Sequence, residues 1–384
     1  MKELIQSLNK NKILWILIFG ILILPFNKVF FTDYPNFYIG KFNFFQTQSI
    51  LVAEIPILIG SLLVLLQKLF SSKIQKFQFL PYLFFFWILI LEPSFHLLVG
   101  ITLLVALFQL NPEQRKLLIL SFFITTGFQA ILATTQLILQ SDLGLKIIGE
   151  PTINENIKGI AKFKIKDHLI LRSYGTLPHP NLLGAYLSLA TLNISYRYKY
   201  FTSIFFAGLL SSFSIAATYI NSLTEALKLS IQRKERVILV LALSALVTIS
   251  VSASRIYQTN HENIEERLVQ IEETIKKDLT IKEILLGYET TTQTEVKLKP
   301  WEIVPTHNIY FLTFQNYGLI AFLLLISMLL YTFKKHPVNG LFLILMFFFD
   351  HFWLTLPHGL ILLILTLALF QKNQDSQAKT QLAS

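Results

Sequence analysis

Residues 117–140 read LLILSFFITTGFQAILATTQLILQ, an apolar run long enough to cross the roughly 30 Å hydrocarbon core of a bilayer as one helix. Similar runs recur along the chain. The first, from Ile13 to about Phe31, follows a basic start and lacks the small-residue cleavage pattern of a signal peptide, so it counts as a span with the N-terminus inside. Further spans are predicted at 48–67, 78–93, 94–110, 117–140, 180–196, 235–255, 308–332, 338–355 and 357–371.

The composition agrees with a membrane protein. Apolar residues make up 53% of the chain, and Asp, Glu, Lys and Arg together make up 15%, well below the roughly 25% of soluble domains. The formal net charge is +10. Most of the basic residues lie in short clusters between the apolar runs and do not share one solvated face, so nucleic acid is not an expected partner. Cysteine is absent, which excludes disulfides, a thiolate nucleophile and Cys-ligated metals. We predict an all-α polytopic membrane protein, a single integral-membrane domain over residues 1–384.

The positive-inside rule orients the chain. The clusters at 197–199 and 233–236 are both basic and both expected in the cytoplasm, so the chain between them must cross the membrane an even number of times. Residues 200–214 are apolar enough for one crossing, whereas the polar residues 215–231 must face protein or a water-filled cavity. Counting both gives about twelve transmembrane helices with both termini inside. Two sizeable extracytoplasmic loops follow from this count, at 141–179 and 256–306.

The first external loop ends in LRSYGTLPHPNLLG, residues 171–184, immediately before a span. Its two prolines hold the backbone extended, and Asn181 is placed to cap the helix that follows. Gly175 and Gly184 allow close approach of backbone or ligand. The alternative is a well-capped helix start in which Arg172 only snorkels to the membrane interface.

The second external loop carries apolar residues at three- and four-residue spacing over 264–279, which predicts an amphipathic helix at the membrane surface, flanked by Arg267. The loop ends in WEIVPTHNIY, residues 301–310. His307, beside Asn308 at a span entrance, is positioned where a general base could meet both a lipid-borne substrate and water. The alternatives are a solvated arginine paired with nearby acids and an interfacial histidine at a helix start.

Together the two segments resemble the O-antigen ligase and polymerase superfamily, integral-membrane glycosyltransferases that act on undecaprenyl-linked glycans. The first segment is similar to an R..G...HPN..G element of that family. The second is similar to the family's external loop, in which an Arg-bearing helix leads through a Gly turn to a His-Asn pair that opens the next span. The stretches that carry this second likeness are Glu266-Arg267-Leu268, Leu286-Gly287-Tyr288, His307-Asn308-Ile309-Tyr310 and Tyr317-Gly318-Leu319.

The resemblance covers roughly residues 117–332, and it implies transfer of a glycan from undecaprenyl pyrophosphate to a glycan, lipid or protein acceptor, with inversion and without a metal or other cofactor. The expected place is the extracytoplasmic face of the bacterial inner membrane. His307 is then the catalytic base, and Arg172 and Arg267 meet the charge of the leaving pyrophosphate. Supporting roles are expected for four polar residues near these three: His179, Asn181, Asn308 and Glu225.

One feature departs from the family pattern. The family's Ser-Arg pair in the polar half-span has no counterpart, because residues 213–229 contain no arginine. Either Lys228, Arg172 or Arg255 substitutes for it, or the chain is an inactive scaffold of a polysaccharide assembly complex. A lipid-linked glycan flippase or transporter is the other alternative, although no duplication into two related halves is visible.

Other ionisable residues lie in or near the predicted spans, where such groups are candidates for function. Glu54 is one of them. Asp350 and His351 are expected near the outside end of the last helix pair, and for these two we favour packing or interfacial hydrogen bonding over a role in the site.

Overall fold

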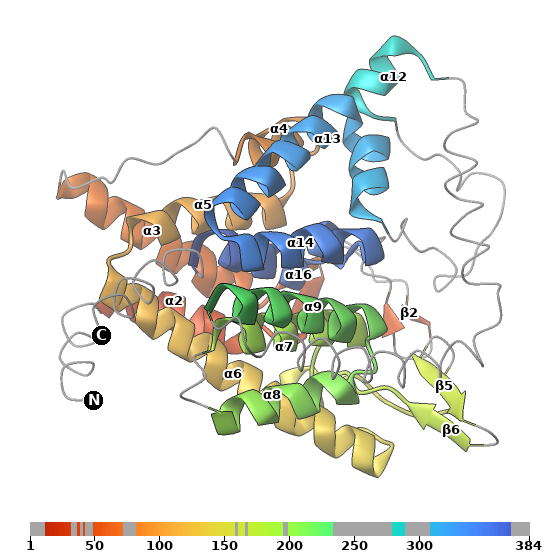
Figure 1. The fold of residues 1–384 in the computed structure, drawn as a ribbon. Coiled ribbons are helices and arrows are strands. Elements are labelled where there is room, and N and C mark those ends of the chain that lie inside the picture. The colour runs from red at the N-terminus through yellow and green to blue at the C-terminus, as the bar shows by residue number, and fades with distance from the viewer. Residues whose placement is uncertain are drawn as a thin grey trace.

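The structure is a computed structural model that describes residues 12–31, 37–38, 41–42, 49–71, 82–157, 160–165, 168–194, 199–232, 279–288 and 308–369. These ranges are mostly helical, which confirms the all-α prediction (Figure 1). The helices are α2 (Lys12–Ile23), α3 (Glu54–Phe70), α4 (Leu83–Leu91), α5 (Phe95–Gln109), α6 (Pro112–Leu139), α7 (Pro180–Asn193), α8 (Lys199–Ser211), α9 (Ile215–Gln232), α12 (Ile281–Leu286), α13 (Ile309–Lys335), α14 (Pro337–Phe349), α15 (Phe352–Thr355) and α16 (Pro357–Ile364), with short helical turns at Lys146–Ile148 and Leu365–Leu369.

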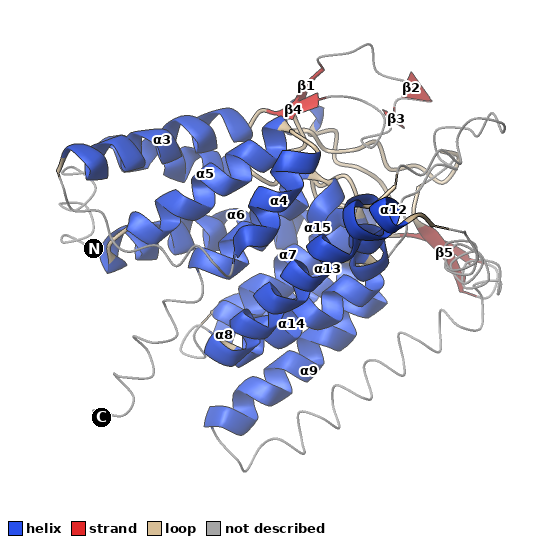
Figure 2. Ribbon diagram, turned by 90° about the horizontal axis from the view of Figure 1, so that it is seen from above, coloured by secondary structure: helices blue, strands red, loops and turns tan. Residues whose placement is uncertain are grey.

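Short antiparallel strand pairs lie in the connections between helices (Figure 2). They are β1 (Val29–Phe31) with β4 (Ser49–Leu51), β2 (Phe37–Tyr38) with β3 (Lys41–Phe42), and β5 (Lys162–Ile165) with β6 (His168–Leu171). Their positions correct two predicted spans. The first ends at Ile23 because Pro25 lacks the N–H that would continue the helix, and the next begins only at Glu54.

The predicted number of transmembrane helices stays a prediction. Within the described ranges, α6 and α13 are long and apolar enough to cross a membrane, and five shorter apolar helices accompany them. The span expected at 235–255 lies outside the described residues. The span expected at 338–355 is in fact divided, because α14 ends at Phe349 and Asp350 is extended.

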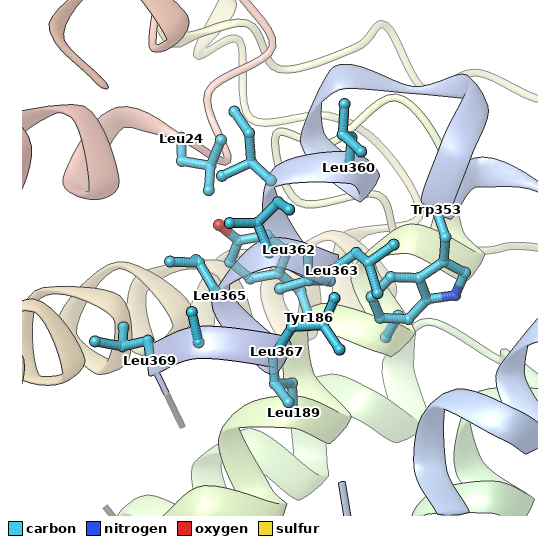
Figure 3. Close-up of a cluster of buried hydrophobic side chains, with 14 of the residues drawn as sticks. Leu24, Tyr186, Leu189, Trp353, Leu360, Leu362, Leu363, Leu365, Leu367 and Leu369 are labelled. Atoms are coloured by element: carbon cyan, nitrogen blue, oxygen red, sulfur yellow. The ribbon is translucent and has the colours of Figure 1, made fainter. Parts of the chain in front are cut away.

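The last described helix lies in the middle of the bundle. From Leu360 to Leu369 every residue is buried, none above 4% exposed. Figure 3 shows these side chains between Leu24, Tyr186 and Trp353, which belong to three distant parts of the chain. A helix that is apolar on all sides is stable only when other helices surround it, and residues 357–369 therefore form the centre of the core.

Arg115 connects this central segment to the end of α5 through hydrogen bonds. Its guanidinium, 4% exposed, donates hydrogen bonds to three backbone carbonyls, those of Leu107 and Leu110 at the end of α5 and that of Ala368. The last carbonyls of a helix have no partner within the helix, and a cation there also favours the helix dipole. One side chain thus closes two helix ends in the core.

Replacing Arg115 by glutamine should destabilise the protein. The change removes a charged donor and leaves buried carbonyls unpaired, so we expect the free energy of unfolding to fall by roughly 2–4 kcal/mol. Thermal unfolding of the purified protein in detergent measures the effect. Lys116→Gln, at the exposed neighbouring position, is the control and should change little, and equal melting temperatures for the two variants would contradict the assignment.

Candidate functional site

The chain before α7 enters the helix bundle without forming a helix. Residues 172–177 are neither helix nor strand, and all of them are buried. Buried backbone N–H and C=O groups need hydrogen-bond partners. Non-helical backbone among apolar helices is tolerated only where protein or water supplies them.

The carbonyls of Ala161 and Ser211 accept from the N–H groups of Arg172 and Ser173, and glutamines of α6 supply partners for the next three residues. Gln136 accepts hydrogen bonds through Oε1 from the backbone N–H groups of Tyr174, at 3.0 Å, and Gly175, at 2.8 Å. Its Nε2 donates to the Gly175 carbonyl at 2.9 Å. Gln129 likewise accepts from the backbone N–H of Thr176 and donates to its hydroxyl, both at 2.8 Å. A side-chain amide that both donates and accepts replaces the missing secondary structure.

A third glutamine extends the row. Gln140 accepts from the backbone N–H of Leu171 at 2.8 Å. It is the C-cap of α6 and has left-handed backbone with φ 53°, while the seven-residue spacing of Gln129 and Gln136 places those two on one face of the helix. Gly175 has a φ of +59°, and a Cβ there would overlap the Gln129 side chain, so glycine is required. Sequence reasoning missed the glutamines, although their spacing within an apolar run is a usable signal.

This arrangement positions Arg172. Its Nη2 donates to Asn181 Oδ1 at 2.6 Å, and its Nε donates to the Ser212 carbonyl at 2.9 Å. Asn181 Nδ2 in turn donates to Asp350 Oδ2 at 2.6 Å. Arg172 and Asp350 are 3% and 4% exposed, so a neutral amide connects a buried cation to a buried carboxylate, and the two charges compensate each other.

His179, not Asn181, caps α7. The Nδ1 of His179 accepts from the backbone N–H of Asn181 at 3.1 Å. The prediction that Asn181 is the cap was wrong, because Pro180, with its fixed φ, takes the first helical position and moves the cap one residue earlier. Since Nδ1 accepts, the neutral ring carries its proton on Nε2. The Asn181 side chain is not used in the cap, and it connects Arg172 with Asp350.

Asp350 was not among the predicted site residues. It follows α14 as its C-cap, and its Oδ1 accepts from the backbone N–H of His351 at 3.2 Å. His351 Nδ1 lies 2.7 Å from the hydroxyl of Thr355, which agrees with the expected structural role for this histidine. The contact between Asp350 and Asn181 joins residues 169 positions apart, and no local sequence pattern reports such a contact.

The start of α13 reaches the same end of α14. Asn308 is the N-cap, and its Oδ1 accepts from the backbone N–H groups of Tyr310 and Phe311. The Tyr310 hydroxyl donates to the Ile344 carbonyl at 2.9 Å, and its ring packs on Phe348 with centroids 4.6 Å apart. Figure 1 shows the first part of α13 running to the end of α14. The two sequence elements therefore converge near Asp350.

Two of the predicted site residues, His307 and Arg267, lie outside the described residues, as does the amphipathic helix expected over 264–279. His307 directly precedes Asn308 in the chain.

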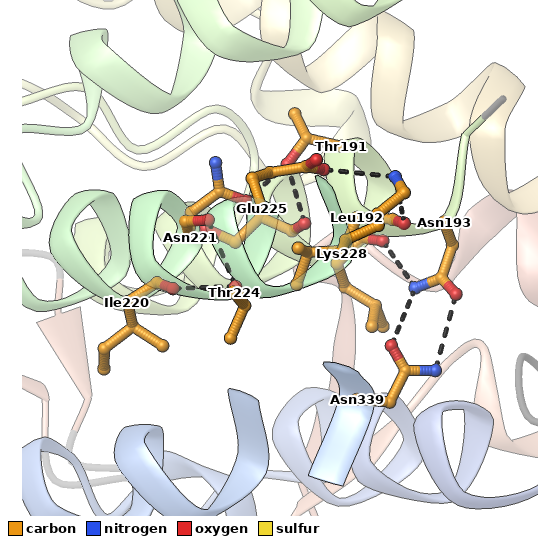
Figure 4. Close-up of polar contacts among 11 residues, drawn as sticks. Thr191, Leu192, Asn193, Ile220, Asn221, Thr224, Glu225, Lys228 and Asn339 are labelled. Atoms are coloured by element: carbon orange, nitrogen blue, oxygen red, sulfur yellow. Dashed lines mark hydrogen bonds and ion pairs between the residues drawn. The ribbon is translucent and has the colours of Figure 1, made fainter. Parts of the chain in front are cut away.

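Glu225 lies in another part of the bundle (Figure 4). Its Oε1 is 3.3 Å from Lys228 Nζ, which donates to the Leu192 carbonyl at 2.7 Å. Leu192 follows Asn181 by eleven residues of α7, or roughly 16 Å along the helix axis. Glu225 and Lys228 therefore stabilise the far end of α7, away from Arg172, and Lys228 does not replace the missing arginine of the motif. Arg255, the other substitute considered, lies outside the described residues.

A hydrogen-bonded pair connects α3 with α5. His96 Nδ1 lies 2.7 and 2.9 Å from the two carboxylate oxygens of the buried Glu54, which also accepts from the backbone N–H of Leu51. Within the described ranges, no group of three His, Asp or Glu residues is arranged to hold a metal ion.

No protein-family model, curated protein or solved structure matches this chain.

The glutamine row can be tested at Gln136, which also donates to Glu150 Oε1 at 2.8 Å. Gln136→Glu would bring two carboxylates together, and we expect a loss of roughly 2–4 kcal/mol at pH 8. The loss should shrink toward pH 5, because one proton shared between the two carboxyl groups restores a hydrogen bond.

Thermal unfolding at several pH values gives the comparison. Thr135→Val, one residue away on a partly exposed face, is the control and should show no such pH dependence. A Gln136→Glu variant as stable as the parent at pH 8 would contradict the role given to this side chain.

Proposed function

We propose that the protein is a membrane glycosyltransferase of the O-antigen ligase and polymerase type, moving a glycan from undecaprenyl pyrophosphate to an acceptor hydroxyl or amide. The observation that carries this proposal is the convergence of two sequence elements far apart in the chain. Arg172 of the first element is connected through Asn181 to Asp350, which follows α14. Tyr310, in the first turn of α13, packs on Phe348 near the same end of α14.

The chemistry needs a fixed positive charge. Breaking the bond between the anomeric carbon and the phosphate oxygen leaves negative charge on the departing diphosphate, and a preorganised cation stabilises it without reorganising during the reaction. Arg172 suits this role because its guanidinium is always charged and is already oriented by Ser212 and Asn181. Arg267 would supply a second cation.

The chemistry also needs a base. His307 would take the proton of the acceptor hydroxyl as the acceptor attacks the anomeric carbon opposite the leaving group, which inverts that carbon. Asn308 supports this role indirectly, because its cap fixes the first turn of the helix to which residue 307 is attached. The proposed scheme assigns no step to a metal ion.

The proposed location is the outer face of the bacterial inner membrane. Arg115 and Lys116 lie at the start of α6, and Gln136, which holds the site loop, lies about 30 Å along that helix. Basic residues favour the cytoplasmic side, so the opposite end of α6 and the site belong outside.

Cysteine labelling tests this orientation. The chain has no native cysteine, so Asn156→Cys, exposed in the first external loop, should react with an impermeant maleimide on intact spheroplasts. Lys116→Cys, exposed at the start of α6, should react only after the membrane is opened. The reverse pattern would place the site on the cytoplasmic side and remove the proposed substrate.

A lipid-linked glycan flippase is the second candidate. It is favoured by one observation, the non-helical backbone of Gly318 inside α13, since discontinuous helices mark the substrate sites of many transporters. A flippase would move the donor lipid across the bilayer and leave its pyrophosphate bond intact.

A transfer assay separates these functions. Purified protein in nanodiscs, supplied with an undecaprenyl-pyrophosphate glycan and a panel of acceptors, should release undecaprenyl pyrophosphate only with the correct acceptor. His307→Ala should abolish release, and Arg172→Lys should lower it about 100-fold, the effect of losing one oriented donor to a developing oxyanion. His168→Ala and Lys146→Ala change exposed residues of the first external loop and should leave the rate unchanged.

The possible results lead to different conclusions. Full activity of His307→Ala would remove the histidine from the mechanism. Protein that binds the donor but never releases undecaprenyl pyrophosphate would be a flippase or an inactive scaffold, which a lipid-translocation assay in liposomes would then distinguish.

A further inference from the structure

α13 is two helices joined at an angle. Gly318 has φ 74° and ψ −176°, which no helix accommodates, and Figure 1 shows the ribbon turning sharply beside α12. We call residues 309–317 the half-helix and the break at Gly318 the elbow. The half-helix begins at the candidate site, with the Asn308 cap, and ends at the elbow.

Two glycines meet at the elbow with their backbones in contact. A Cβ on Gly318 would overlap the carbonyl of Leu285 and the nitrogen of Gly287, and a Cβ on Gly287 would overlap the backbone of Asn316. Both glycines also have positive φ, at 74° and 87°, where other residues are strained. Glycine is required at both positions for these two separate reasons.

A main-chain hydrogen bond completes this contact. The backbone N–H of Tyr288 donates to the carbonyl of Gln315 at 2.8 Å. That carbonyl lies in the last turn of the half-helix, where it has no helical partner. α12 therefore closes the end of the half-helix, and the positions of α12 and the half-helix are coupled.

A side-chain hydrogen bond ties the elbow to another pair of helices. The hydroxyl of Tyr317 donates to Glu92 Oε2 at 2.7 Å, and Glu92 is the C-cap of α4, in the turn that leads to α5. The elbow is thus held on one side by α12 and on the other by the turn after α4. Both contacts lie at the end of the half-helix away from the site.

Because the half-helix is long, a small change of the angle at the elbow moves its first residues by a large distance. Nine residues span about 14 Å, so a tilt of about 10° at the elbow would move Asn308 by roughly 2 Å over that lever. A misplacement of about 1 Å can cost roughly 100-fold in rate when reacting groups must be aligned.

We propose that the Gly287–Gly318 contact and the Tyr317–Glu92 hydrogen bond set the tilt of the half-helix, and so position its start relative to Arg172, Asn181 and Asp350. Tyr317 and Glu92 are positioning residues: they act through the half-helix and touch no reacting atom. This inference rests on the proposed function, since it assigns these residues to the transfer step.

The kinetic test compares single substitutions at the elbow. Tyr317→Phe removes only the hydroxyl and should lower kcat about 10-fold, with KM for the lipid donor unchanged. Glu92→Gln keeps an acceptor for that hydroxyl and should stay within about threefold of the parent. Tyr219→Phe, at an exposed position of α9, is the control and should have no effect. A rise in KM at constant kcat would overturn the proposal, because it would indicate loss of donor binding.

A distance measurement tests the elbow without using activity. Spin labels at Phe311→Cys and Leu323→Cys lie on either side of Gly318, in a chain that has no other cysteine. Pulsed electron paramagnetic resonance should give a changed or broadened distance in Tyr317→Phe and a larger change in Gly318→Ala. The distance should be unchanged in Tyr219→Phe.

The two measurements test the proposed transfer function and the proposed role of the elbow independently. If the parent protein transfers no glycan, the proposed function fails, and the label distance alone decides whether these contacts set the elbow angle. If Tyr317→Phe leaves the distance unchanged, the hydrogen bond does not hold the elbow. If the distance changes while kcat does not, the elbow has no part in positioning the reacting groups.

Discussion

The site depends on one constraint, that extended backbone buried among helices must have its polar groups satisfied. Gln129 and Gln136 of α6, with Gln140 directly after it, accept from the backbone N–H groups of Leu171 and residues 174–176. The carbonyls of Ala161 and Ser211 accept from those of Arg172 and Ser173. Without the glutamines the loop before α7 would have to move toward water, and Arg172 would move with it. The row of glutamines thus determines where a buried cation lies, although none of the three is itself joined to that cation.

The buried charges are arranged for precise placement more than for stability. A buried ion pair often contributes little net stability, because desolvating the two ions costs about as much as their attraction returns. Here Asn181 stands between Arg172 and Asp350 and is hydrogen-bonded to both. The arrangement connects the segment before α7, the start of α7 and the end of α14, so that the positions of these three segments depend on one another.

Local sequence signals predicted the helical class and the polar character of α9. They failed where a distant contact decides the outcome. Packing or interfacial hydrogen bonding was expected for Asp350, but nothing in the sequence pointed to its partner Asn181, which lies 169 positions away. The cap of α7 was misassigned because Pro180 shifts the helix start, and the first span was overextended past Pro25. Glutamine carries no charge, so a search for ionisable residues within apolar runs did not single out Gln129, Gln136 and Gln140.

The central position of residues 357–369 has a consequence for biogenesis. These residues are buried on every side, yet they are made after all the other described helices. Helices made earlier pack directly on one another, as α2 does on α3 and α6 on α8, but the apolar faces of α5 and α6 that cover this segment stay open until it arrives. A ribosome that stalls before residue 357 therefore leaves a chain with apolar surface exposed inside the bundle, which quality-control proteases would recognise.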